Sequence, residues 1–335
     1  MGAIWFDRDQ LREFLTELVG TKLGLTIDDD DLERFFALRE VPVPAATMVG
    51  HIRMRSEELE ELAQICLEHF GDPDAGHVRS SPLITLSVLK AFEDSPDAMD
   101  VLTYVIAEIG PRVNDSSEKS IKVDDILNIA GERWGETGRQ IAERFFLELN
   151  ARLFTSPWTE VARTAYESRT DLRNLFTSRT LPAAVQQFFD QRFVDYLDAN
   201  GNDITKMHWR QFEGLVGEAL VKAGLKVELG PGSNDDGVDI RAWDPTQPDE
   251  APALLLVQCK REKKKVGKVV VKALAADVGF EGARVGLVAT TSSWSPGARE
   301  TVRARMYPLI EADGDHIRNW LRNMRTPGTG PWLPH

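Results

Sequence analysis

The 335-residue sequence lacks most features of secreted, membrane-spanning or zinc-binding proteins. Its two cysteines, Cys66 and Cys259, provide no disulfide framework and favour a reducing compartment. Its six histidines show no zinc-ligand spacing. The longest wholly apolar runs, such as ALLLV at 253–257, fall far short of the ~20 residues needed to span a membrane. The first residues show no secretory signal, so we expect a cytoplasmic protein with no membrane segment.

Basic charge is scarce overall but unevenly distributed. The net charge is −13, yet residues 1–204 carry 21 Lys and Arg against 37 Asp and Glu, whereas residues 205–335 carry 19 against 16. A polyanion such as DNA is repelled by the first part and accepted by the second. The asymmetry predicts two units with different partners.

Residues 1–200 are predicted to form an all-α domain. Apolar residues recur three and four positions apart in one amphipathic segment after another, including 8–20, 56–71, 81–94, 123–134, 138–154, 157–169 and 181–199. The acidic tetrad 28–31 is consistent with either a metal site or a solvated helix start, and the helix start is favoured. The Gly-, Asn- and Asp-rich stretch 198–205 is the best candidate for a linker.

Residues 201–330 are predicted to form an α/β domain with a mixed central sheet flanked by helices. The periodicity changes to helix, strands, helix, strand, helix, strand and helix. Strands are expected within 225–229, 238–243, 253–260, 283–291 and 307–311. Ser295 and Pro296 are placed to begin a helix, as cap and first-turn residue.

Four polar residues stand out because they interrupt the apolar surfaces of this domain. Asp239 lies between Val238 and Ile240, and Gln258 and Lys260 share one face of the strand in which they lie. On a helical wheel, Glu213 is the carboxylate at the edge of the packed face, while Glu218 falls on the opposite side. Pairing of the two strands would bring Asp239, Gln258 and Lys260 together.

A divalent cation would offset the desolvation of such a cluster. Carboxylate and amide oxygens are suitable ligands for Mg²⁺, or alternatively Mn²⁺. A lysine beside the cation would orient or deprotonate a water molecule and stabilise the charge of a phosphoryl transition state. Considered one at a time, Asp239 is more simply interpreted as a strand-end cap, and Lys260 as a strand-edge residue with an extended side chain. The joint pattern favours catalysis.

The order of these segments resembles the Mrr-like restriction endonuclease catalytic domain, a branch of the PD-(D/E)xK nucleases, over about residues 206–325. The matching pieces are an FE helix, a DDGVD turn and strand, a QCKR strand, a T…W…A segment and a final LIEADG strand and helix. The resemblance does not extend to residues 1–200. It implies a restriction-endonuclease-like fold and a metal-dependent endonuclease.

The resemblance also implies roles for individual residues. Asp239 would be the main metal ligand, Gln258 and Glu213 would complete the metal shell, and Lys260 would be the catalytic lysine. The sequence departs from the family at Asp236, where the family usually has glycine, and this departure puts the geometry of the turn in doubt. Trp294 could stack on a base, but burial is the favoured interpretation.

The run KREKKKVGK at 260–268 is consistent with a solvated loop or with a phosphate-contacting surface. In a nuclease the second interpretation is favoured, because lysine and arginine supply affinity that does not depend on sequence. The predicted DNA-binding residues are Arg261, Lys263, Lys264, Lys265 and Lys268.

The function predicted from the sequence is hydrolysis of DNA phosphodiester bonds by a Mg²⁺-dependent endonuclease, with a restriction or anti-phage defence role implied by the resemblance. The acidic region 1–200 would sense a signal, mediate homo-oligomer or partner-protein assembly, or mask the basic nuclease surface. Masking predicts that deleting residues 1–200 raises activity. The alternatives are an inactive nuclease fold that binds nucleic acid or a partner, and a nuclease acting on RNA or branched DNA.

Overall fold

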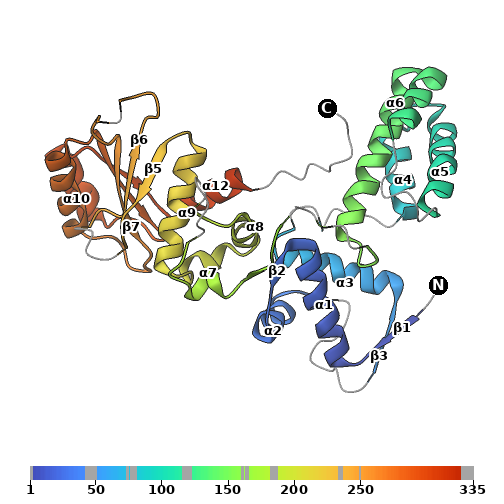
Figure 1. The fold of residues 1–335 in the computed structure, drawn as a ribbon, viewed down its shortest axis with the longest axis horizontal. Helices are drawn as coiled ribbons and strands as arrows, with labels where there is room; N and C mark the ends of the chain where they lie inside the picture. The colour runs from blue at the N-terminus through green and yellow to red at the C-terminus, as the bar shows by residue number, and fades with distance from the viewer. Residues whose placement is uncertain are drawn as a thin grey trace.

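The computed structural model describes residues 3–41, 51–72, 75, 81–114, 123–159, 162, 166–181, 188–232, 237–248 and 250–325. Figure 1 shows the C-terminal sheet and its helices at one end of the molecule and helices α4, α5 and α6 at the other, with α1, α2 and α3 between them. No helix among the described residues is both long enough and apolar enough to span a membrane.

The C-terminal part is built on a five-stranded mixed sheet, as predicted. The strands are β5 (Lys226–Leu229), β6 (Ile240–Trp243), β7 (Leu255–Lys260), β8 (Val285–Thr290) and β9 (Leu309–Ala312), and they follow one another in this order across the sheet. Pairing is antiparallel from β5 to β7 and parallel from β7 to β9. The parallel pairs require crossovers, which helices α10 (Lys268–Glu281) and α11 (Pro296–Arg305) provide.

Side-chain alternation along the strands divides the apolar residues between two faces. Val257 packs in the core that contains α9 (Trp209–Lys222) and α12 (Gly314–Met324), whereas its neighbour Leu256 packs in the core beneath α10 and α11. The α11 start is as predicted: Pro296 is the first helical residue, and the Ser295 hydroxyl accepts a hydrogen bond from the Ala298 N–H at 3.2 Å.

The N-terminal region is rich in helix, but the all-α prediction is not confirmed. It contains short strands, paired as β1 (Ala3–Phe6) with β3 (Ile52–Arg55) and β2 (Leu25–Thr26) with β4 (Thr170–Asp171). Its other elements are α1 (Arg8–Leu23), α2 (Asp29–Leu38), α3 (Ser56–His69), α7 (Asn174–Thr177) and α8 (Gln191–Ala199). Strands of two to four residues are too short to show period-two alternation in the sequence.

The acidic tetrad 28–31 begins α2, as the favoured interpretation held. Asp28 is the N-cap, and its carboxylate accepts from the Asp31 N–H at 2.9 Å, while the Asp31 carboxylate accepts from the Asp28 N–H at 3.0 Å. This reciprocal capping box places negative charge at the positive end of the helix dipole.

Helices α4 (Ser81–Ala91), α5 (Ala98–Asn114) and α6 (Asp124–Thr155) form a separate bundle with its own hydrophobic core. The predicted segments at 123–134 and 138–154 form one continuous element, kinked at Gly135, where φ is 68°. The helix predicted over 157–169 is not formed at the described residues of that stretch.

The stretch predicted as a linker is packed. It forms the 3₁₀ helix η3 (Gly201–Thr205), in which Asp203 and Ile204 are buried. One continuous hydrophobic core extends across it, from Leu67 of α3 through Leu197 of α8 to Ile317 of α12. The α1–α3 part and the C-terminal sheet therefore share a core, unlike the α4–α6 bundle.

Candidate active site

Asp239 lies directly before β6, where the antiparallel ladder between β6 and β7 ends. Its N–H donates to the Val257 carbonyl at 2.9 Å, and its own carbonyl accepts from the Gly230 N–H at 2.8 Å. Its side chain then replaces a backbone carbonyl as the next acceptor along β7, because Oδ2 accepts a hydrogen bond from the Cys259 N–H at 2.6 Å. The carboxylate is thereby fixed at the open end of the two strands, with an exposure of 8%.

Gln258 lies beside this carboxylate on β7 and is also buried. The nearest described part of the preceding turn is Gly237, whose φ of 90° is strained for any residue with a side chain. A Cβ at Gly237 would lie 3.6 Å from the Gln258 Nε2, so the turn passes directly over the amide. Asp236, where the sequence departs from the family pattern and the turn geometry was in doubt, lies outside the described residues.

Glu213 reaches the same region from α9. The helix begins after His208, whose Nδ1 accepts from the Arg210 N–H at 3.1 Å. Arg210 Nη1 donates both to Glu213 Oε2 at 2.7 Å and to the Gly230 carbonyl at 2.9 Å. The guanidinium thus holds the helix carboxylate against the end of β5. Sequence reasoning missed Arg210, although its position three residues before Glu213 gives the helical spacing for an ion pair.

The Cys259 thiol shows that these charges lie close together. Burial raises its pKa well above the usual value, and the carboxylates of Asp239 and Glu213 raise it further, against an opposing effect of the Lys260 ammonium. The thiol therefore stays protonated at neutral pH. Three of the four predicted site residues are near enough to this one sulfur to perturb its ionisation.

Lys260 ends β7, and its main chain is fixed by the neighbouring strand. The Lys260 carbonyl accepts from the Thr290 hydroxyl at 2.8 Å and from the Thr291 N–H at 3.3 Å. Thr290 is completely buried at the end of β8. Sequence reasoning missed Thr290, because a single threonine at the end of an apolar strand has no distinguishing pattern.

One prediction about α9 is wrong. Glu213 is not the one carboxylate of this helix on a packed surface, because Glu218 is also only 5% exposed. Glu218 Oε2 accepts from the Phe188 N–H at 2.8 Å. The chain before α8 covers the side of the helix that an isolated wheel assigns to solvent.

The donor set fits a hard divalent cation. Asp239, Gln258 and Glu213 contribute carboxylate and amide oxygens from three elements, and all three side chains are at least nine-tenths buried. Among the described residues, no three His, Cys, Asp or Glu side chains are grouped as a metal site. A cation held here would therefore rely on the Gln258 amide and on water for part of its shell.

The basic stretch after β7 has a fixed backbone and exposed cationic side chains. The Lys264 carbonyl accepts from the Ser292 hydroxyl at 2.7 Å, and Val266 forms a bridge with Trp294, which is buried as favoured. The exposed lysines are Lys263, Lys264 and Lys265 of this loop and Lys268 at the start of α10. They are exposed with the described N-terminal residues in place.

Arg261 is arranged differently from these lysines. It is half-buried, and its Nη1 donates to the Thr205 carbonyl at 2.9 Å. It joins the end of β7 to η3, the segment that leads into α9. Its position therefore also suits a structural link between the strand and the start of that helix.

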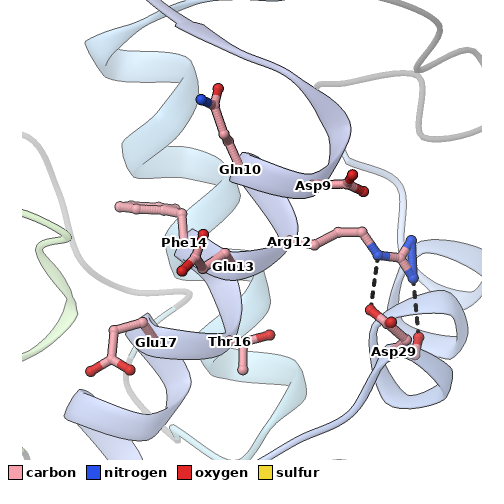
Figure 2. Close-up of a pocket in the computed structure, with 8 residues that line it drawn as sticks. All are labelled: Asp9, Gln10, Arg12, Glu13, Phe14, Thr16, Glu17 and Asp29. Carbon is pink, nitrogen blue, oxygen red and sulfur yellow. Dashed lines mark hydrogen bonds and ion pairs between the residues drawn. The ribbon is translucent and has the colours of Figure 1, made fainter.

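A hollow of about 770 Å³ along α1 is lined mainly by acidic side chains, in contrast to the basic stretch after β7 (Figure 2). Four carboxylates line it, whereas Arg12 is its sole basic lining residue and is bonded to Asp29 through Oδ1 at 3.1 Å and the carbonyl at 3.3 Å. The acidic lining residues are Asp9, Glu13, Glu17 and Asp29. This surface repels polyanions, in agreement with the acidic balance of the N-terminal sequence.

Residues 204–321 match the family model described as a restriction endonuclease, the Mrr catalytic domain. The match confirms the predicted resemblance and includes Glu213, Asp239, Gln258 and Lys260. We call this segment the restriction endonuclease domain. The N-terminal region matches no family model.

Among solved structures, the chain is similar to the MspJI restriction endonuclease in complex with a 27-mer oligonucleotide. The identity is 17%, the TM-score is 0.27, and the similarity covers 58% of this chain and 40% of that one. The chain thus spans less than half the length of that structure. No curated protein matches the sequence.

Proposed function

We propose that the protein is a divalent-metal-dependent DNA endonuclease. The observation that carries the proposal is the group of buried oxygen donors at the end of β6 and β7, with Asp239 Oδ2 bonded to the Cys259 N–H at 2.6 Å. Burying these groups costs free energy unless a ligand or charge compensates them. The match of residues 204–321 to restriction endonucleases supports the reaction class.

In this proposal Asp239, Gln258 and Glu213 would hold Mg²⁺, with Mn²⁺ as an alternative. The cation supplies Lewis-acid stabilisation of the negative charge that develops on the phosphate. The oxygen of a water molecule forms a bond to phosphorus, one bridging P–O bond breaks, and the leaving oxygen takes up a proton. The Lys260 Nζ orients this water and stabilises the transition state.

The proposed DNA-contacting residues are Arg261, Lys263, Lys264, Lys265 and Lys268. Their backbone is fixed against the 290–295 segment, so the ammonium groups project from a rigid support. Such contacts bind phosphate oxygens without reading the base sequence. The proposal leaves sequence selection to other residues.

We propose a defence role for this activity, cleaving foreign DNA in the cytoplasm, with the N-terminal region as regulator. Masking of the loop lysines is not the form of regulation that this conformation supports, because those lysines are exposed. The shared core between α1–α3, α8 and α12 supports positional control instead. Assembly through the N-terminal region stays a prediction that light scattering would test.

The test of the activity is incubation of the full-length protein with supercoiled plasmid, methylated or unmethylated, with Mg²⁺ or with EDTA. Cleavage should require the cation and be lost in Asp239→Asn and Lys260→Gln. Asp244→Asn is the matched control, because that half-buried aspartate directly follows β6 and bonds Thr246. Cleavage that survives both site substitutions would refute the mechanism.

The same assay separates the alternatives. Cleavage of RNA or branched DNA in preference to plasmid would favour the alternative that the protein is a nuclease of the same fold with a different substrate. Binding of DNA at low salt with no cleavage of any substrate would favour a non-catalytic nuclease fold.

A further inference from the structure

A second cavity lies at the junction between the N-terminal part and the restriction endonuclease domain. It has a volume of about 310 Å³, within the ~300–1,000 Å³ range of small-molecule sites. Its walls come from α2, the end of α3, the end of α8 and η3. The residues that matter to its chemistry are Arg34, Arg39, His69, Asn200, Asp203 and Lys206.

The acidic side chains of the cavity are already occupied by partners. Asp203 accepts from the Tyr196 hydroxyl at 2.7 Å and from Lys206 Nζ at 2.6 Å. Asp31 is bonded to Arg34 and to the capping box of α2. These carboxylates therefore have little remaining capacity for a cationic ligand.

The cationic side chains retain more capacity. Arg39 has Glu68 as an ion-pair partner at 3.7 Å, beyond hydrogen-bond distance, and its guanidinium carries five N–H donors. The side chain of Lys206 is 59% exposed, and its ammonium has further N–H groups beyond the one directed at Asp203. With Arg34 they place three cations on the wall of the cavity against two carboxylates, and Glu68, the partner of Arg39, is not among the lining residues. The wall itself therefore favours an anion.

His69 provides an independent sign of a ligand site. It lines the cavity and is 3% exposed, and its Nδ1, inaccessible to solvent, has no hydrogen-bond partner within the described part of the chain. An unsatisfied buried polar atom costs about 1–3 kcal/mol. A bound molecule that offers a hydrogen-bonding group would recover this loss by drawing the imidazole ring toward the cavity, because Nδ1 has no accessible surface in this conformation.

We infer that this junction cavity binds a small phosphate monoester. The phosphate would accept hydrogen bonds from Arg39 and Lys206, with Arg34 adding charge, and the organic part would meet His69 and Asn200. Arginine is suited to this role because its planar fork bonds two phosphate oxygens at once.

The cavity is also connected to the candidate active site. Lys206 directly follows Thr205, whose carbonyl accepts from Arg261 at 2.9 Å. Arg261 is next to Lys260, and η3 leads into the helix that carries Glu213. A ligand that orders η3 would therefore order both sides of the active site. This regulatory consequence rests on the proposed nuclease function, whereas binding does not.

The test is isothermal titration calorimetry of the full-length protein with inorganic phosphate, ribose 5-phosphate, adenosine 5′-monophosphate and uncharged adenosine. A phosphate monoester should bind with a Kd below ~1 mM, and adenosine should not bind. Arg39→Gln and Lys206→Gln should each weaken binding roughly tenfold or more, because each removes a charged hydrogen bond. Arg8→Gln, which removes a half-exposed arginine of α1, should leave binding unchanged.

The inference would be overturned if no monoester binds or if inorganic phosphate alone binds. It would also be overturned if the Arg39→Gln and Lys206→Gln variants bind the monoester as tightly as the wild type. The coupling has its own readout, since bound monoester should slow amide hydrogen exchange at 201–210 and 258–263. Unchanged exchange there would overturn the coupling. Binding without cleavage of any DNA would instead count against the proposed function and leave the site standing.

Discussion

The carboxylate of Asp239 accepts a hydrogen bond from the backbone N–H of Cys259 at 2.6 Å, at the point where the β6–β7 ladder ends and the candidate active site begins. A side chain thus occupies the position that a strand carbonyl would take in a continuing ladder. This relationship explains how an acid can be part of a buried strand end without disrupting it.

Asp239→Asn should abolish cleavage while preserving the fold. The asparagine oxygen can still accept from the Cys259 N–H, but the negative charge that would hold a cation is lost. We expect the cleavage rate to fall by roughly 10³-fold, the scale of losing a major electrostatic contribution. Plasmid nicking assays with Mg²⁺ would measure the rate, and thermal unfolding would check the fold. A rate equal to that of the Asp244→Asn control would contradict the ligand role.

Lys260→Gln should reduce the cleavage rate with little effect on DNA affinity. The lysine lies at the end of β7, and its proposed role is in the transition state and not in binding the substrate. We expect a loss of about 10²–10³-fold in single-turnover rate. The control is Lys272→Gln, which removes an exposed lysine of α10. Equal losses in the two variants would show that Lys260 contributes only general positive charge.

The triple variant Lys263→Gln, Lys264→Gln and Lys265→Gln should bind DNA more weakly and with less salt dependence. Each lost phosphate contact should reduce the slope of log K against log salt by about 1. Fluorescence anisotropy at several salt concentrations would measure this slope. Lys90→Gln, on the exposed surface of α4, should leave it unchanged. An unaltered slope in the triple variant would exclude this loop as the DNA-contacting surface.

The sequence was sufficient to predict the sheet of the restriction endonuclease domain, whereas the site role of its polar residues stays a prediction. Strands β7 and β8 are apolar runs of the length expected for buried parallel strands, and Ser295 with Pro296 marks the start of α11. Gln258 and Lys260 interrupt the β7 run, and Asp239 stands between apolar residues just before β6, which distinguishes all three in the sequence. Their chemistry follows from residue type, and their proximity follows from strand pairing.

What the sequence could not show depends on partners from distant segments. Glu218 is buried because Phe188 covers it, and Arg261 is directed at Thr205, fifty-six residues away. The strand pair β2 and β4 joins residues near 25 and 170 in a ladder of two residues each. Periodicity within one segment carries no information about such contacts.

The shared core leads us to expect that the N-terminal part and the restriction endonuclease domain unfold together. Leu197→Ala, in α8, should destabilise the protein by about 2–5 kcal/mol and increase hydrogen exchange in α12, because both helices pack in one cluster. Leu102→Ala, equally buried in α5, should increase exchange within α4–α6 and leave α12 unchanged. Hydrogen exchange measured by mass spectrometry would distinguish these patterns. An unchanged α12 in Leu197→Ala would show that the two parts unfold independently.

The same core bears on deletion of residues 1–200. Removing them would expose apolar side chains of α12 that pack against α8 and open the core that α9 and α12 share with α3. We therefore expect the truncated chain to be unstable, so low activity in it would not argue against regulation. Substitutions at the junction cavity are the better test of regulation, because they leave this core intact.

His69 should make the protein less stable as the pH falls. Burial lowers its pKa to about 4, with Arg39 and Arg34 acting in the same direction and Asp203 opposing them. Between pH 6.5 and 4 the unfolded chain binds a proton that the folded chain does not, so stability is fully present above 6.5 and is lost toward 4. The loss should be about 3 kcal/mol at most, from 1.36 kcal/mol per pKa unit.

Denaturant unfolding of wild type and His69→Phe at a series of pH values would measure this contribution. Phenylalanine keeps the ring packing against Phe35 and Phe70 but does not titrate. Asp31 also titrates in acid, and burial raises its pKa, which gives it the opposite effect on stability. The difference between the two proteins isolates the imidazole, and it should shift in favour of His69→Phe as the pH falls. A difference that stays constant between pH 7 and 4.5 would mean that the folded protein accommodates a charged His69.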